Sequence, residues 1–169
     1  MKSTFFLTGK WASENPEWVR DISKRGHEIG NHTWSLPDMT ALHPSAQQSE
    51  IERTESILTQ LLGRRTNRHW RAPSGARSAQ VLKTVEALGF TSIYWTVDSL
   101  DSVEPPKTPD FLRSRMMHVG EPSTAQALPG VLGNLHQRGF KSVTISRLLE
   151  PHGTRQTADA RAPSMSSHD

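Results

Sequence analysis

His32 opens the stretch HTWSLPDM, and a hydroxyl residue follows it directly. This order is typical of half a metal site, because a neutral imidazole binds divalent ions. A protein metal site needs at least three side-chain ligands, however. Leu36, four positions after His32, has no atom that binds a metal, and Pro37 disfavours helical geometry at Leu36. We therefore expect a loop at the end of a strand, with a hydrogen-bonded structural histidine as the alternative role of His32.

Three further segments carry ionisable groups suited to catalysis. Arg71 begins RAPSG, where a guanidinium could orient a carboxylate and lower its pKa, or form a salt bridge at the surface. Asp98 and Asp101 follow an apolar segment; one could orient a histidine, or both could serve in turns or helix caps. His118 lies in MMHVG and could act as a general acid near neutral pH, or be a packed core histidine.

These residues need a framework, and the chain alternates short apolar segments with amphipathic ones. The predicted strands are 4–8, 27–31, 69–71, 92–97 and 141–145, and the predicted helices are 16–25, 45–62, 78–88, 110–115 and 124–138. Such alternation predicts an α/β fold with a parallel sheet or barrel. In these folds the reacting groups gather at the carboxyl ends of strands. His32, Arg71, Asp98 and His118 all fall at predicted ends of this kind.

The composition excludes several classes of protein. Hydrophobic residues make up 34% of the 169 residues, the formal net charge is +3, and cysteine is absent. Without cysteine there are no disulfides, thiolate metal sites or cysteine nucleophiles. The basic residues are scattered, so a nucleic-acid partner is not expected. No apolar run is long enough to span a bilayer, and the N-terminal segment is a poor signal peptide, which leaves the localisation open.

Taken in order, these segments resemble the polysaccharide deacetylase family, also described as NodB-homology domains or carbohydrate esterase family 4. The most specific part is the run GHEIGNHTWS followed by PDM, and the resemblance covers about Ser3 to Leu149. The other matching segments are TFFLTGKWASENP, WRAPSG, WTVDSLDS, MMHVGEPSTAQALPGVL and GFKSVTISRLL. The resemblance implies a distorted (β/α) barrel and the metal-dependent removal of N- or O-acetyl groups from a polysaccharide. We expect one domain over residues 1–150 and a disordered polar tail over residues 151–169.

The family's catalytic roles carry over to the matching positions of this sequence. In the family, one aspartate and two histidines hold zinc or another divalent ion, which activates a water for attack on the acetyl group. His32 matches the first histidine, and Leu36 replaces the second. Arg71 matches the arginine that orients the catalytic base, while Asp101 and His118 match the pair that protonates the leaving amine. The expected substrate groove consists of Trp34, Pro73, Asp98 and Trp95, with core packing as the alternative for the two tryptophans.

The sequence departs from the family's pattern at the motif T-F-D-D-G, which supplies the base and the aspartate ligand. This motif does not occur in the chain, and the expected barrel lacks its first strand–helix unit, on the order of 30 residues. Asp38 is the nearby carboxylate that could replace the ligand lost at Leu36. Because one imidazole does not make a zinc site of useful affinity, we expect little zinc binding and little deacetylase activity.

Three interpretations remain open from the sequence. In the first, the chain is a polysaccharide deacetylase by family, with an incomplete chain and an impaired site. In the second, it is a non-catalytic module that binds glycans or another partner through the retained groove. In the third, it is a relic that folds poorly because its sheet lacks the first strand. In the first two, the expected partner is an acetylated polysaccharide, which could be chitin-like, peptidoglycan or xylan.

Overall fold

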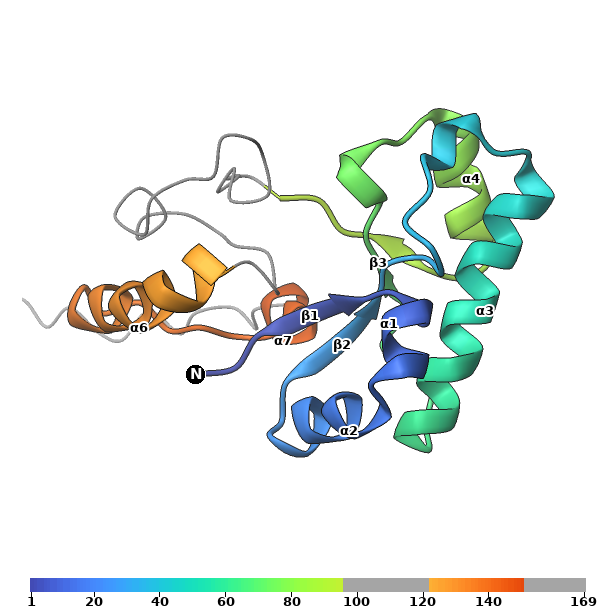
Figure 1. Cartoon of the computed structure of the whole chain (residues 1–169). Coiled ribbons are helices and arrows are strands. Elements are labelled where there is room, and N and C mark those ends of the chain that lie inside the picture. Colours follow the sequence, from blue (N-terminus) through green and yellow to red (C-terminus); the bar gives the residue numbers. More distant parts are fainter. Residues whose placement is uncertain (96–121, 151–169) are drawn as a thin grey trace, which may run out of the picture.

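A four-stranded parallel sheet forms the centre of the computed structural model, which describes residues 1–95 and 122–150 (Figure 1). The strands lie in the order β1 (Thr4–Leu7), β2 (Glu28–Asn31), β3 (His69–Trp70) and β4 (Thr91–Ser92). Leu7 pairs with Asn31, Asn31 with Trp70, and Trp70 with Ser92, so all four carboxyl ends lie along one edge. The predicted α/β class with a parallel sheet is confirmed.

The helices of the described residues have clear local causes. They are α1 (Gly9–Glu14), α2 (Pro16–Lys24), α3 (Pro44–Leu62), α4 (Ala79–Ala87), α6 (Pro122–Gln137) and α7 (Ile145–Leu149), with 3-10 turns at Met39–Ala41 and Pro73–Gly75. Pro16 begins α2, the Ser78 side chain accepts a hydrogen bond from the first turn of α4, and Gly63 ends α3 in a left-handed conformation. The predictions for α2, α3, α4 and α6 are confirmed. The helix predicted over 110–115 lies outside the described residues.

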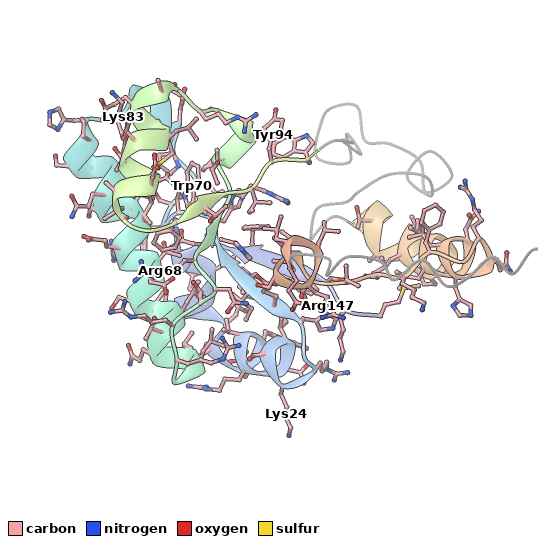
Figure 2. The ribbon with its side chains drawn as sticks, turned by 180° about the vertical axis from the view of Figure 1, so that it is seen from behind. Lys24, Arg68, Trp70, Lys83, Tyr94 and Arg147 are labelled. Atoms are coloured by element: carbon pink, nitrogen blue, oxygen red, sulfur yellow. The ribbon has the colours of Figure 1, made fainter. Side chains whose placement is uncertain are left out.

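Within residues 1–95 and 122–150, two hydrophobic clusters form the core between the sheet and the helices. The first comprises Met39, Ile51, Trp70, Ala72, Val81, Val85 and Phe90, and the second comprises Leu7, Ala12, Val19, Ile29 and Leu58. Trp70 is fully buried and lies inside the fold beside α3 and α4 (Figure 2). Helix α3 contributes Ile51 to the first cluster and Leu58 to the second, so the same helix stabilises both parts of the core.

The structure differs from the sequence-based predictions in the extent of the strand after Phe90 and in an additional helix after β1. The strand predicted over 92–97 forms a ladder only at Thr91–Ser92, because its partner β3 ends at Trp70 just before the turn at Pro73. The Ile93 amide still donates to the Trp70 carbonyl over 2.8 Å, and residues 96 and 97 lie outside the described residues. The six-residue helix α1 was not predicted, although the Thr8 side chain caps it by accepting from the Trp11 amide.

The strand predicted over 141–145 is wrong. Residues 141–144 have no regular structure, and α7 begins at Ile145. The Thr144 side chain caps this helix, and the Ile145 amide donates to the Thr4 hydroxyl over 2.8 Å instead of joining a ladder. Helix α7 is thereby attached beside the amino end of β1 (Figure 1). In the part of the chain that the structure describes, no helix has both the length and the apolar character needed to cross a membrane.

Candidate active site

His32 and Arg71 lie side by side at the carboxyl edge of the sheet. His32 directly follows β2, and its amide donates to the Leu7 carbonyl over 3.0 Å. Arg71 directly follows β3, and its amide donates to the Asn31 carbonyl over 3.0 Å. The His32 Nδ1 atom lies 2.8 Å from the Arg71 carbonyl oxygen. Because a carbonyl only accepts, Nδ1 carries the hydrogen, and the lone pair of the neutral ring is on Nε2, as in a metal-binding histidine.

The Arg71 guanidinium occupies a half-buried position between aromatic rings. Its carbon atom lies 4.1 Å from the centre of the Phe6 ring and 5.8 Å from the centre of the Trp95 ring. Burial lowers the pKa of the guanidinium, because a charged group loses hydration there. The Nε atom is buried and has no hydrogen-bond partner among the residues that the structure describes. This side chain is therefore well placed to bind a carboxylate or another anion, which is the role expected of the arginine that orients a base.

The residue at position 36 cannot serve as the second histidine ligand of the family's metal site. Leu36 is 53% exposed and has a left-handed backbone with φ of +60°. A leucine side chain has no lone pair, so of the two family histidines only His32 is present. Among the residues described by the structure, no three histidine, aspartate or glutamate side chains are grouped closely enough to hold one ion. Within this described part of the chain, the donors near His32 do not fit a three-ligand zinc site.

The hydrogen bonds of Asp38 do not support its use as a replacement metal ligand for the histidine missing at position 36. Its Oδ1 atom accepts hydrogen bonds from the Thr40 amide at 2.9 Å and the Thr40 hydroxyl at 2.7 Å. These bonds cap the 3-10 turn Met39–Ala41 and, with the hydroxyl contact as the main cause, lower the pKa of Asp38. The carboxylate therefore serves as a cap.

The expected groove residues have different surroundings. The Arg53 guanidinium lies 3.6 Å from the centre of the Trp34 ring, and a Cβ atom at Gly9 would lie only 2.3 Å from that ring. These contacts favour the packing role for Trp34, whose edge also borders a shallow pocket of about 150 Å³ beside Leu36. Pro73 is buried at the start of its 3-10 turn.

Trp95 belongs to an aromatic stack that is open to solvent. Its ring lies parallel to that of Tyr94, with centres 4.3 Å apart and an angle of 18° between the planes. Tyr94 is 47% exposed and lies at the far end of the segment after β4 (Figure 2). The Arg77 guanidinium covers Tyr94 at 3.6 Å. Tyr94 therefore lies between the Trp95 ring and the Arg77 guanidinium, and Trp95 lies near Arg71, in the region where a sugar chain is expected.

The structure brings together only part of the predicted site. His32, Arg71 and Trp95 gather at the carboxyl edge, whereas Asp98, Asp101 and His118 lie outside the described residues. Two residues that the sequence analysis missed, Gly9 and Glu50, contact the loop after His32. Both contacts join segments far apart in the sequence, so no local pattern could have indicated them.

Comparison with known proteins gives a consistent set of relatives. The family model described as "Polysaccharide deacetylase" matches residues 1–93. The chain is 30% identical over 162 residues to the uncharacterized protein YlxY of Bacillus subtilis, covering 89% of this chain and 49% of YlxY. It is 27% identical over 158 residues to the peptidoglycan-N-acetylmuramic acid deacetylase PdaA of Bacillus subtilis, covering 86% and 60%. The chain thus spans about half the length of the curated relatives it matches.

Solved structures show the same fold. A CE4 family pseudoenzyme of Bacillus anthracis, BA3943, superposes with a TM-score of 0.78 at 29% identity, covering 89% of this chain and 56% of that one. A mutant of BA3943 is described as having restored enzymatic activity. A family 4 carbohydrate esterase of Streptomyces lividans superposes with a TM-score of 0.81 at 28% identity, covering 88% and 81%. These neighbours confirm the predicted deacetylase type of α/β fold.

Proposed function

This chain belongs to the polysaccharide deacetylase family, and on that basis we propose that it acts on acetylated glycans through a hydrolytic site impaired at position 36. The name of its relative PdaA supports peptidoglycan as the ligand class, and acetylated chitin-like chains are the closest chemical alternative. Hydrolysis of an acetyl group in this family relies on a divalent ion, usually zinc. We propose that the natural chain does not hold such an ion stably.

The observation that supports the impairment is the leucine at the second position of the histidine pair. His32 has the tautomer suited to a ligand, but Leu36 stands at the position of the second family histidine. Metal affinity depends on the number of correctly placed ligands, and of the family's three ligand positions this sequence retains His32 alone. The structural likeness to BA3943, which is described as a pseudoenzyme, supports the same interpretation here.

The remaining residues retain chemistry for binding a glycan and protonating a leaving group. We propose that Arg71 holds a carboxylate or substrate anion, and that Asp101 and His118 form the acid pair. Trp34, Pro73, Asp98 and Trp95 are proposed to line the groove. Of these, Trp95 stacks on the exposed Tyr94 and lies near Arg71, which supports its contact with a sugar ring.

The test of the impairment is zinc binding before and after repair of the pair. We expect the natural chain to hold no stoichiometric zinc at micromolar concentration, and Leu36→His to bind zinc about tenfold tighter or more. The matched control is Leu82→His, which introduces a histidine at an exposed leucine of α4. Its zinc affinity should resemble that of the natural chain. Isothermal titration gives the affinities, and acetate release from acetylated chito-oligosaccharides gives the activity. Stoichiometric zinc together with acetate release by the natural chain would contradict the proposal.

A second candidate is a glycan-binding module without catalysis, and Tyr94, which is 47% exposed and stacks on Trp95, supports it. This function predicts that acetylated chito-oligosaccharides bind without turnover. Tyr94→Ala should then weaken binding by about fivefold or more, since one aromatic stack is worth about 1 kcal/mol. Equal binding by Tyr94→Ala and the natural chain would argue against this role of the stack.

A further inference from the structure

The loop after His32 has a backbone conformation that the rest of the protein must maintain. Thr33 has a φ of +66° and Leu36 a φ of +60°, both in the left-handed region. Residues with a Cβ atom, and β-branched threonine above all, are strained in this region. Such strain persists only where surrounding contacts fix the conformation.

Those contacts come first from Glu50, a half-buried residue of α3. Its Oε2 atom accepts hydrogen bonds from the Trp34 amide at 2.8 Å and the Ser35 amide at 2.9 Å. Its Oε1 atom accepts a third bond from the Ser35 hydroxyl at 3.0 Å. Hydrogen bonds to a carboxylate are about twice as strong as those between neutral groups. One side chain therefore fixes two consecutive peptide units in the middle of the loop.

The opposite side of the loop is held by the start of α1. The Gly9 amide donates to the Thr33 carbonyl at 3.0 Å, and the Lys10 amide donates to the Trp34 carbonyl at 3.1 Å. These donors belong to the first turn of a helix, where amides have no partner within the helix. The loop thus lies between amide donors of α1 and the carboxylate acceptor of α3.

We propose that Glu50 is a positioning residue that fixes the geometry between His32 and position 36, whatever side chain stands at position 36. Its carboxylate accepts the hydrogen bonds from the Trp34 and Ser35 amides that hold the left-handed loop. These hydrogen bonds are made within the polypeptide and do not involve an ion. The consequence for metal binding rests on the proposed function, but the effect on the loop does not. No other residue of α3 makes a hydrogen bond to the amides of Trp34 or Ser35 in the described part of the chain.

The experiment compares Glu50→Ala and Glu50→Gln with Glu52→Ala. Glu52 lies on the same helix, is exposed, and its carboxylate accepts a bond from Gln48 of that helix. Since alanine favours helix formation, a loss in Glu50→Ala cannot come from helix propensity. Glutamine keeps the shape of glutamate and one acceptor oxygen but lacks the charge, so it tests partial rescue.

The first measurement is hydrogen exchange at the Trp34 and Ser35 amides, followed by NMR. Loss of a bond to a charged acceptor should make these amides exchange about 10- to 100-fold faster in Glu50→Ala. Glu50→Gln should show an intermediate rate, and Glu52→Ala should match the natural chain. Unchanged exchange in Glu50→Ala would overturn the proposal. If Glu50→Ala does not fold, Glu50→Gln decides the question: faster exchange confined to the loop supports the proposal, and unchanged exchange overturns it.

The second measurement is zinc affinity in the Leu36→His background. Adding Glu50→Ala should weaken zinc binding about 10- to 100-fold, the usual effect of removing a residue that orients ligands, while Glu52→Ala should not. Equal zinc affinity with and without Glu50 would contradict positioning of the ligands. Failure of Leu36→His itself to bind zinc would count against the proposed function, and the exchange measurement would still decide the role of Glu50.

Discussion

The positively charged guanidinium of Arg71 is half-buried and therefore incompletely hydrated. Its guanidinium lies against Phe6 and near Trp95, and burial lowers its pKa. A charge without a close opposite charge reduces stability when it is buried, because lost hydration is not compensated. Such a residue is understandable at a binding site, where the compensating charge comes from a ligand or another carboxylate.

The first prediction is that Arg71→Met does not destabilise the protein. Methionine retains apolar contact with the Phe6 ring and removes the buried charge, so the free energy of unfolding should stay unchanged or rise by about 1 kcal/mol. Urea unfolding measures it, and Arg77→Met, at an exposed arginine over Tyr94, serves as the control. A loss of more than about 1 kcal/mol in Arg71→Met would show that the cation is stabilising.

At the residue scale, sequence reasoning found the groups at strand ends but not the groups that hold them. His32 and Arg71 could be predicted because each ends a strand, and parallel strands place such ends together. Glu50 and Gly9 could not, because their contacts with the loop depend on how α1 and α3 pack against it. The sequence left open whether Trp34 stacks on a sugar or packs in the core. The contact that favours packing comes from Arg53, whose guanidinium lies over the Trp34 ring in the folded chain.

At the scale of elements, α1 approaches the loop so closely that only glycine fits at its first position. A Cβ atom at Gly9 would lie 2.3 Å from the Trp34 ring and 2.8 Å from the Thr54 hydroxyl. To admit a Cβ atom at Gly9, the Trp34 ring or the Thr54 side chain, which is buried in α3, would have to shift. Helix α1 therefore depends on Gly9 for its contact with the rest of the protein.

The second prediction is that Gly9→Ala and Gly133→Ala change stability in opposite directions. Overpacking at Gly9 should lower the free energy of unfolding by about 1–3 kcal/mol. Gly133 in α6 has open space around the position of a Cβ atom, so alanine there should stabilise the helix by about 0.5–1 kcal/mol. Thermal melting of the two variants gives the signs, and a stable Gly9→Ala would show that the Trp34 ring can move.

Helix α7 is attached to the sheet through a buried carboxylate. Glu28 accepts hydrogen bonds from the Ser146 amide and the Ser146 hydroxyl, each over 3.0 Å, and its Oε1 atom lies 2.5 Å from His69 Nδ1. Burial by itself raises the pKa of Glu28, but the bonds from Ser146 and His69 outweigh it, so the net pKa is lowered. The folded protein thus favours the ionised carboxylate.

The third prediction concerns pH. Since the pKa of Glu28 is lower in the folded chain than in the unfolded one, its contribution is complete above the ordinary glutamate pKa and is lost as pH falls through the folded value. Glu28→Gln should cost about 1–3 kcal/mol at neutral pH, and the difference from the natural chain should shrink in acid. Melting temperatures from about pH 7 to about pH 3 measure this, with exposed Glu86→Gln as the control. A difference that does not vary with pH would contradict it.

Elements with strong periodicity could be predicted from sequence, while those defined by distant partners could not. Helix α3 was predicted within one residue of its ends because its apolar positions recur at helical spacing and Gly63 ends it. The segment 141–145 was predicted as a strand, yet it lies outside the described sheet. Its Ile145 amide bonds to Thr4 instead, which leads the chain into α7.

At the scale of the whole molecule, one long helix stabilises both halves of the core. Ile51 packs in the cluster with Trp70, and Leu58 packs in the cluster with Val19, two turns apart on α3. Both residues are completely buried. Loss of either cluster would expose one face of the same helix, so the two clusters should unfold together.

The fourth prediction is a single cooperative transition. Ile51→Ala and Leu58→Ala should each lower the free energy of unfolding by about 2–5 kcal/mol, as expected for large cavities. In each variant, tryptophan fluorescence and far-ultraviolet circular dichroism should give the same midpoint. Two separate transitions, or a broad one without a clear midpoint, would instead support the interpretation of a poorly folding relic.

The amide donors of α1 and the carboxylate of α3 build the loop after His32 from within the polypeptide. Proteins whose binding loops are organised by a cation unfold when chelators remove it. Among the described residues, these contacts to the loop come from the polypeptide itself, so we expect the chain to refold from denaturant in buffer that contains EDTA. Adventitious ions can therefore be removed with a chelator at the start of a preparation. Each candidate ion can then be added to a protein whose loop after His32 is already folded.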